Sequence, residues 1–373
     1  MFEEIFNING YIFWIILIFI LSIIIFFVLR SFSTYFKFIY PNAKLEAIGN
    51  PFLSEKELNK VIEGQNITNF KDIVKKSINF DVKGTTIYEM QRSLDTHLIQ
   101  TIEMIRKDSS KKMNGFFDLY LEKLDSFLIK NVIKKRLNNE KIDNKIIENA
   151  IKPITKKLLY KITDSKKEDL IKILKDYSYD LESFDFKSVE NVNLLELDTA
   201  FDKHFINKFR KQKVPRKCEK AKQKFVSYFI DIKNIKNILR AKQMGYDQQV
   251  CNKLFLGEGH EVADWRYKKM CESSSVKEII SSLAETSYYN LLSNTLETFS
   301  KENTIQILEN ALDVQFLKFL RDLSVENYIT IGPTLRFIVS KEFEIRNLKV
   351  IVKGIGEGLS KDLIKKLVIA ESA

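Results

Sequence analysis

The pattern of hydrophobic and polar positions separates an apolar segment near the start of the chain from a long region of helical periodicity. Residues 11–29 are apolar apart from Ser22. As a helix they rise about 28 Å, close to the roughly 30 Å hydrocarbon thickness of a bilayer. A soluble core helix would need apolar partners on every side. A cleaved signal peptide would carry basic residues before the apolar run, where this chain has Glu3 and Glu4. We therefore expect residues 1–36 to form a single-pass membrane anchor.

The charges that flank the span predict its orientation. Glu3 and Glu4 precede it, and Arg30, Lys37 and Lys44 follow it. Basic residues favour the cytoplasmic side of a membrane. We expect the N-terminus outside and the bulk of the chain on the cytoplasmic side of the cell membrane.

Beyond the anchor, apolar residues recur every three or four positions, which is typical of helices that bury one face. Two stripes show this, namely Leu194, Leu197, Phe201, Phe205 and Phe209, then Phe225, Tyr228, Ile232, Ile235 and Leu239. The chain has only 12 glycines and 5 prolines among 373 residues, so the backbone has few breaks. The pattern predicts an all-α fold.

Two sequence blocks occur three times in the same order. The first block, at residues 93–98, 200–205 and 311–316, shares Asp95, Asp202 and Asp313. The second block, at residues 129–132, 232–235 and 345–348, shares Asn131, Asn234 and Asn347. Such repetition predicts three similar helical modules, at 45–140, 141–245 and 246–370, around a pseudo-threefold axis. We expect these six residues to be structural repeat positions.

The residues available for catalysis are few. His97 and His204 occupy equivalent repeat positions, but Gln315 stands there in the third repeat. Glutamine can replace a hydrogen bond of histidine but neither its metal ligation nor its acid–base role. The three cysteines show no metal-binding or disulfide spacing. We expect no catalytic residue, metal site or cofactor, and hence no enzyme.

Two segments suggest other functions. Residues 210–224 hold eight basic residues and one acidic residue, in a chain whose net charge is +11, so anionic lipid or nucleic acid is a possible ligand. No aromatic residues interleave for base stacking, which favours a solvated connector and argues against nucleic acid. The glycines in 354–358 suggest a phosphate loop, but Leu359 stands where the third glycine of the motif belongs. A helix end with a turn is the simpler interpretation.

The chain resembles the family of C subunits of archaeal A-type ATP synthases, whose eukaryotic counterparts are the d subunits of V-type ATPases. The resemblance is carried by residues 40–45 (YPNAKL), 231–242 (DIKNIKNILRAK), 331–335 (IGPTL) and 341–348 (KEFEIRNL). One departure lies in the first repeat, where Leu128 stands in place of the later Asp231 and Glu344. Any polar contact made by those acids is therefore not expected there.

The resemblance implies three similar helical domains forming a funnel and a non-catalytic role in the central stalk. Such a protein joins the shaft subunits to the proteolipid rotor ring during proton- or sodium-driven ATP synthesis. Its partners would be ring subunits, shaft subunits and membrane lipid, with no nucleic acid. A span that turns with the rotor is expected inside the lumen of the ring. The alternatives are a membrane-anchored helical scaffold that binds anionic lipid or nucleic acid through 210–224, and a membrane-bound enzyme that uses the glycines at 354–358.

Overall fold

The computed structural model of the chain describes residues 10–64, 66–181, 184 and 193–369. Within these residues it is helical and has no strand, which confirms the all-α prediction. The helices are α2 (Tyr11–Ile48), α3 (Glu55–Gly64), α4 (Ile67–Ile78), α5 (Ile87–Asp108), α6 (Asn114–Leu137), α7 (Asn144–Ile147), α8 (Pro153–Asp164), α9 (Leu170–Asp176), α10 (Leu194–Lys211), α11 (Glu219–Gln243), α12 (Gln248–Lys253), α13 (Asp264–Glu272), α14 (Val276–Ser282), α15 (Ser287–Glu302), α16 (Gln306–Glu326), α17 (Gly332–Gly356) and α18 (Lys361–Leu367).

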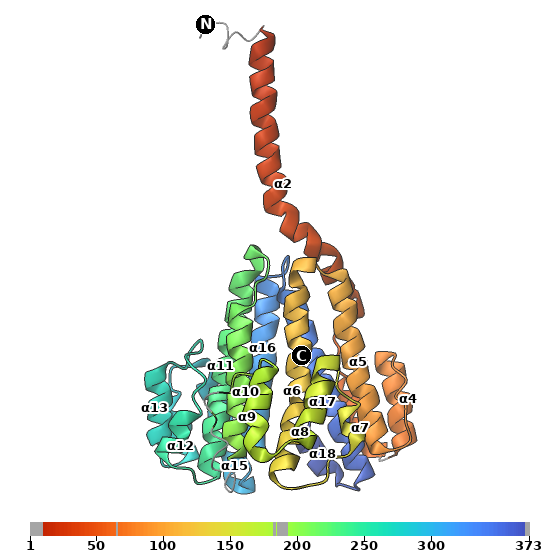
Figure 1. Cartoon of the computed structure of the whole chain (residues 1–373), viewed down its shortest axis with the longest axis vertical. Coiled ribbons are helices and arrows are strands. Elements are labelled where there is room, and N and C mark those ends of the chain that lie inside the picture. Colours follow the sequence, from red (N-terminus) through yellow and green to blue (C-terminus); the bar gives the residue numbers. More distant parts are fainter. Residues whose placement is uncertain (1–9, 65, 182–183, 185–192, 370–373) are drawn as a thin grey trace.

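Six long helices pack in a closed cycle. α5 contacts α6, α6 contacts α10, α10 contacts α11, α11 contacts α16, α16 contacts α17, and α17 returns to α5. They form three pairs, α5/α6, α10/α11 and α16/α17, and each pair carries one copy of both repeat blocks. Within each pair, the turn that joins the two helices lies near the base of α2, and short helices surround the opposite end (Figure 1).

Local sequence signals explain where several helices begin. Thr86 and Glu89 form a capping box at the start of α5, because the Thr86 hydroxyl accepts the Glu89 N–H at 3.2 Å and the Glu89 carboxylate accepts the Thr86 N–H at 3.1 Å. Ser275 caps α14 by accepting the Glu278 N–H at 3.2 Å. Pro333 lies in the first turn of α17, where its missing N–H leaves no bond unmade.

The predicted apolar stripes face the core with two exceptions. In the first stripe all members but Leu194 are buried, and Leu194 is exposed because it begins α10. In the second stripe all members but Tyr228 are buried. Tyr228 is half-buried and stacks on Phe319, with 3.3 Å between the ring centroids. The period of the apolar residues thus identified the buried faces of α10 and α11 correctly.

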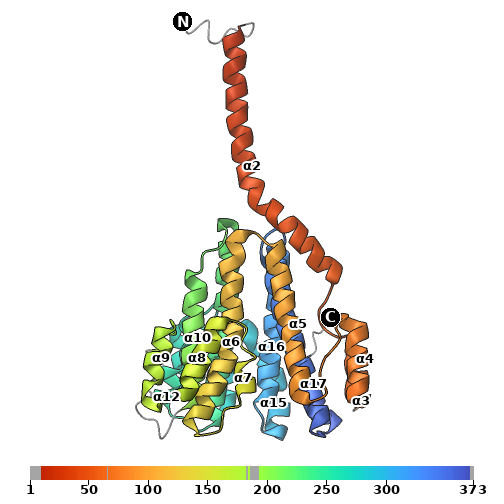
Figure 2. The same cartoon turned by 45° about the vertical axis from the view of Figure 1, so that its right-hand side comes forward.

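The α2 helix is longer than the predicted span and joins the body of the protein. It continues through Pro41, which lacks the N–H that would bond to the fourth residue before it. The lower part of α2 bends away from the upper part (Figure 2), as expected near an internal proline. Phe38 and Leu45 are buried, and the Asn42 amide donates to the carbonyl of Tyr328 at 2.6 Å. The interval between the predicted anchor and the first predicted module therefore lies inside one helix.

Candidate functional site

The three repeat aspartates each form an ion pair with a basic residue on the second helix of a pair. The shortest contacts are Asp95–Lys349 at 2.8 Å, Asp202–Lys233 at 2.9 Å and Asp313–Lys236 at 2.6 Å. The pairs differ in exposure: the Asp313 side chain is 6% exposed and that of Asp95 is 49% exposed. Because water screens charge, the buried pair at Asp313 interacts more strongly than the exposed pair at Asp95.

Lys236 and Lys349 occupy the same place in the repeat and connect neighbouring helix pairs. Each lies two residues after the repeat asparagine. Lys236 of α11 reaches Asp313 of α16, and Lys349 of α17 reaches Asp95 of α5. Two of the three junctions between helix pairs are therefore linked by equivalent ion pairs.

The remaining junction, between α6 and α10, uses different positions. Lys130 and Lys134 of α6 contact the Asp198 carboxylate of α10 at 3.2 and 3.1 Å. Asp198 lies one helical turn before Asp202. Ion pairs therefore cross every junction in the cycle of long helices.

Two of the repeat asparagines fix the chain that follows a long helix. The Asn234 side chain donates to one carbonyl and accepts one N–H, both at 3.0 Å, from residues 256–257. Asn347 does the same with Ile369, at 2.7 and 3.0 Å. The third asparagine, Asn131, is exposed. The first repeat therefore has the same residue type at this position, but the side chain is not buried as it is in the other two repeats.

Buried acids three residues before Asn234 and Asn347 bind backbone N–H groups. Asp231 accepts the N–H groups of residues 260–262 at 2.8 to 3.0 Å, and Glu344 accepts that of Leu53 at 3.1 Å. Burial raises the pKa of Glu344 to about 7. Asp231 thus binds residues 260–262 to α11, and Glu344 binds the segment around Leu53 to α17.

The first repeat replaces this contact instead of losing it. Leu128 stands at the equivalent position, but Asp125, one turn earlier on α6, accepts the N–H groups of Ile151 and Lys152 at 2.7 and 3.0 Å. Burial raises the pKa of Asp125 even though these bonds favour its charged form. The first repeat, where Leu128 left this contact open, therefore keeps it through an acid one turn earlier on the same helix.

The helices α6, α11 and α17 meet across the inside of the cycle, although none of them is next to another in it. Lys123 of α6 contacts Glu342 of α17 at 3.0 Å, and its ammonium lies 5.8 Å from the ring centre of Phe229 on α11. The Tyr120 hydroxyl also donates to Glu342. Burial opposes ionisation of Glu342, but Lys123 and Tyr120 hold its pKa below the ordinary value. These three helices therefore line the interior.

One cation precedes each of the three repeat asparagines, and each cation lies over an aromatic ring of the same inner helices. We call Lys130, Lys233 and Arg346 the inner cation set. They lie over the rings of Phe127 at 5.0 Å, Phe229 at 5.5 Å and Phe343 at 4.4 Å. Phe127 is 53% exposed and the Arg346 side chain 46%. The repeated Lys or Arg before each asparagine was the signal that could have identified this set from sequence.

The two repeat histidines make aromatic contacts. His97 stacks on Phe80 with 4.0 Å between ring centroids, and His204 stacks on Tyr179 at 5.2 Å. Burial lowers the pKa of each imidazole to about 4, so both are neutral at pH 7. No group of three or more metal-ligating side chains occurs among the residues that the structure describes.

Comparison with known proteins identifies the family of this fold. The family model described as "ATP synthase (C/AC39) subunit" matches residues 41–367, almost the whole body below the apolar part of α2. The chain belongs to this family. The resemblance inferred from the sequence is thereby confirmed.

Curated relatives extend the match over nearly their full lengths. The chain is 27% identical to the C subunit of the A-type ATP synthase of Methanocaldococcus jannaschii, with 89% of this chain and 86% of the relative covered. It is 26% identical to the C subunit from Methanobrevibacter smithii, covering 93% and 92%. It is also 26% identical to that from Thermococcus kodakarensis, covering 90% and 91%. All three relatives carry the same description, so partners within an ATP synthase are implied for this family member.

The basic segment 210–224 in this family member is a turn between two long helices. α10 ends at Lys211 and α11 begins at Glu219, with Pro215 between them. Lys222 is buried and donates to the carbonyl of Gln212 at 2.6 Å, so one of the basic residues closes the turn. One exposed cation of the segment lies close to α2, since the Lys217 ammonium is 5.4 Å from the ring centre of Tyr35.

The glycines at 354–358 do not follow a strand. α17 is helical through Gly356, and Gly358 adopts a φ of 68° in the turn that follows. This is a helix end with a left-handed turn residue, which glycine adopts without a steric penalty. The strand–turn–helix geometry of a phosphate loop is absent from this part of the structure.

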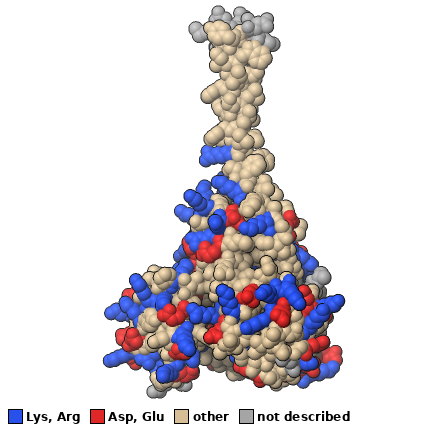
Figure 3. Space-filling model, turned by 90° about the vertical axis from the view of Figure 1, so that its right-hand side faces the viewer, with Lys and Arg blue, Asp and Glu red and all other residues tan. Residues whose placement is uncertain are grey.

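The apolar part of α2 stands free of the body. α2 is the one helix of the described residues that is long and apolar enough to cross a membrane, and no residue of its most apolar window is buried. Figure 3 shows a column without charged side chains and with basic residues near its junction with the body. Arg30 and Lys37 are the basic residues of this stretch. An exposed apolar surface of this size in a member of a membrane-associated ATP synthase family favours insertion into lipid.

Proposed function

We propose that this chain is the non-catalytic central-stalk component that connects the central shaft of an A-type ATP synthase to its membrane rotor ring, during ATP synthesis driven by protons or sodium. The observation that carries the proposal is the family match over residues 41–367. The closed cycle of six helices supports it, because a protein that transmits torque has to resist deformation. Ion pairs cross each junction of this cycle.

The body acts as a funnel of three similar modules, at 45–140, 141–245 and 246–370. Lys123 and Glu342 close the interior near the end from which α2 leaves, where the three inner helices touch. Farther along the same helices, Phe127 and Arg346 are about half exposed. This widening would receive the end of the shaft, and Arg346, the most exposed member of the inner cation set, would face acidic side chains on it.

The turns at the base of α2 face the rotor ring, and α2 enters the lumen of the ring. In this arrangement Tyr11–Leu29 spans the membrane, the N-terminus lies outside, and Arg30, Lys37 and Lys44 lie at the cytoplasmic interface. A span that turns with the ring cannot lie in the surrounding lipid without meeting the stator. Its exposed apolar surface suits a lumen filled with lipid.

Affinity purification of the tagged full-length chain from solubilised native membranes tests the role. We expect proteolipid ring subunits and shaft subunits to co-purify, with one copy of this chain per ring. Isolation of the chain without ATP synthase subunits would refute the proposal and favour a scaffold that binds lipid through 210–224. Density of the assembled complex tests the placement of α2, since an empty lumen or a helix outside the ring would contradict it.

A charge-reversal pair tests the interior separately. Lys233→Glu with Arg346→Glu reverses two of the three inner cations, and we expect shaft subunits to be lost from the purified complex while the ring is retained. Lys172→Glu, on the exposed surface of α9, controls for the reversed charge, and Lys349→Glu, which breaks the exposed pair with Asp95, controls for the loss of a repeat ion pair. Loss of the ring together with the shaft, or no loss of either, would exclude the inner cation set as the shaft contact.

A further inference from the structure

The lower part of α2, beyond the predicted span, has an apolar face that no described residue covers. Its opposite face packs on the body through Phe38 and Leu45, which are buried. The outer face of such a helix is normally polar, because it meets water. Here the outer face is apolar, and its large side chains are 50% to 62% exposed. We call the residues of this face the lower stripe, namely Phe32, Phe36, Ile39, Tyr40, Ala43 and Ala47.

The turn between α16 and α17 extends this apolar surface to one side. Val325 is 73% exposed and Ile329 is 52% exposed. Tyr328 joins the turn to α2, because its hydroxyl donates to the Glu46 carboxylate and its carbonyl accepts the Asn42 amide, both at 2.6 Å. A hollow of about 330 Å³ lies between this turn and the end of α2, and it offers room for a side chain of a partner.

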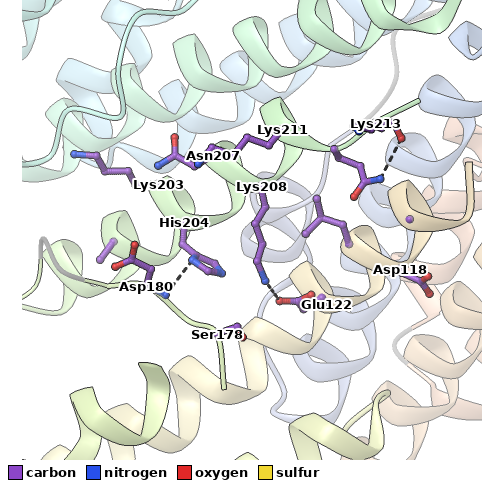
Figure 4. A pocket seen from close by; sticks show the side chains of 14 residues that line it. Asp118, Glu122, Ser178, Asp180, Lys203, His204, Asn207, Lys208, Lys211 and Lys213 are labelled. Carbon is purple, nitrogen blue, oxygen red and sulfur yellow. Dashed lines mark hydrogen bonds and ion pairs between the residues drawn. The ribbon is translucent and has the colours of Figure 1, made fainter. Parts of the chain in front are cut away.

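A larger groove elsewhere on the body has the opposite chemistry. It encloses about 1030 Å³ between α6 and α10, and lysine and acidic side chains surround it (Figure 4). Lys208 and Glu122 pair there at 2.6 Å. Water covers such a charged lining at little cost. An exposed apolar face that runs along a helix is instead typical of a surface that binds a partner.

Lipid can cover only the first part of the lower stripe. If the hydrocarbon core ends at Leu29, the headgroup layer extends about 5–8 Å farther. Along the helix axis, Phe32 lies about 5 Å beyond Leu29 and Ala47 about 27 Å beyond it. Lower α2 also descends beside the body in both views (Figures 1 and 2). The rest of the stripe therefore calls for a protein partner that rises out of the membrane.

The proposed rotor role limits which protein this can be. Because α2 is continuous with the body and turns with it, a stable partner has to turn as well, which excludes stator subunits. The shaft is assigned to the funnel interior, away from this face. The ring subunits remain, and the bend in α2 would carry its lower part from the lumen toward their rim (Figure 2).

We propose that the lower stripe and the turn formed by Val325, Tyr328 and Ile329 bind apolar side chains at the cytoplasmic ends of the ring subunits. This assignment rests on the proposed function and identifies the surface and the chemistry of its ring contact. The contact lies on one side of the base of α2. The turn between α10 and α11, which carries Arg216 and Lys217, differs from it in being basic.

Photo-crosslinking in native membranes tests which partner covers the stripe. The photoreactive residue p-benzoylphenylalanine replaces Phe36 or Tyr40 in the full-length chain, where the added bulk points outward. The same replacement of Trp265, which is 60% exposed on α13, is the control. We expect covalent adducts with a proteolipid subunit from positions 36 and 40 and none from position 265.

A polar double variant tests the contribution of the contact. Phe36→Gln with Tyr40→Gln changes two exposed side chains, so the helical circular dichroism should not change. In the proposed arrangement lipid surrounds the span, so the stripe is expected to hold the ring after solubilisation. Retention of the ring on the tagged chain should fall tenfold or more, with the shaft still bound. Ile154→Gln with Trp265→Gln, at positions 56% and 60% exposed, is the matched control and should retain the ring.

Several results would overturn the assignment. Adducts with lipid alone, with a second copy of this chain or with a stator subunit would each identify a different partner. Equal retention of the ring by the double variant and its control, or loss of the shaft together with the ring, would also contradict it. If the unchanged chain purifies without any ATP synthase subunit, the proposed function fails as a whole. If the unchanged chain and the double variant retain the ring equally, the proposed function stands and only this contact is refuted.

Discussion

The three repeat aspartates occupy the same position in the sequence pattern but different environments, and this predicts unequal energetic roles. Asp313→Ala removes the carboxylate from a pair in which Lys236 is 10% exposed, whereas Asp95→Ala removes it from a pair in which Lys349 is 33% exposed. Burial lowers the pKa of Lys236, which shows how poorly its surroundings solvate the charge. The same substitution therefore leaves a buried cation in one case and a hydrated cation in the other.

The magnitude follows from that difference in burial. Removing one partner of a buried ion pair typically costs about 3–5 kcal/mol, because the remaining charge is left unpaired. Glu309 also attracts Lys236, which places Asp313→Ala near the lower end of that range. An exposed pair contributes about 0–1 kcal/mol. We expect the free energy of unfolding to fall by about 3 kcal/mol for Asp313→Ala and by less than about 1 kcal/mol for Asp95→Ala.

Urea unfolding of the full-length chain in detergent, followed by circular dichroism at pH 7, measures both values. High salt should remove the small effect of Asp95→Ala and leave most of the effect of Asp313→Ala, because buried pairs are screened less. Replacing both members of the buried Lys236–Asp313 pair, with Lys236→Met and Asp313→Leu, should recover most of the loss, because Arg346, the other partner of Asp313 at 2.8 Å, is 46% exposed and stays hydrated. Equal costs at the two positions, or no recovery in the double variant, would refute the reasoning from burial.

Three further predictions concern other contacts. Burial raises the pKa of Glu344 to about 7 from the usual 4.5. As pH rises through this interval, Glu344 ionises in the unfolded chain before it ionises in the folded chain, so the folded state loses stability. In denaturant titrations, the free energy of unfolding should fall by up to ~3 kcal/mol between pH 4.5 and 8, relative to Glu344→Gln. Gly356→Ala would place a methyl group against the side chain of Ile87 and should cost about 1–3 kcal/mol, which Ile87→Val should partly restore in the same titrations; an unchanged midpoint would show that the helix end is loosely packed. Asp125→Ala should cost about 3 kcal/mol or more, since two backbone N–H groups lose their acceptor, and a cost below about 1 kcal/mol would mean that Asp125 does not replace the acid of the later repeats.

The sequence was sufficient to predict helices and buried faces, because both depend on local periodicity. Phe201, Phe205 and Ile235 are buried where the stripes place them. The contacts between helix pairs were not predictable in this way. Lys349 and Asp95 are 254 residues apart, and periodicity indicates which face of a helix is buried but not which helix covers it.

Two departures show how tertiary contacts override local signals. Pro41 would normally end a helix before it, but Phe38, Asn42 and Leu45 are held against the body on both sides of the proline. Asp125 was missed because aligning repeats by residue identity does not detect an acid displaced by one helical turn. In both cases the deciding information lies in residues far along the chain.

The packing of α17 against α5 has a consequence for synthesis of the chain. The contact between Lys349 and Asp95 spans 254 residues, which a ribosome takes roughly 13 to 50 s to translate at about 5–20 residues per second. During this time the face of α5 that α17 will cover has no partner, although α5 can already pack on α6. The N-terminal helix pair is therefore exposed to aggregation and to chaperones for most of translation. Variants that weaken the last helix pair should lower the yield of the protein in cells more than they lower the stability of chains that have already folded.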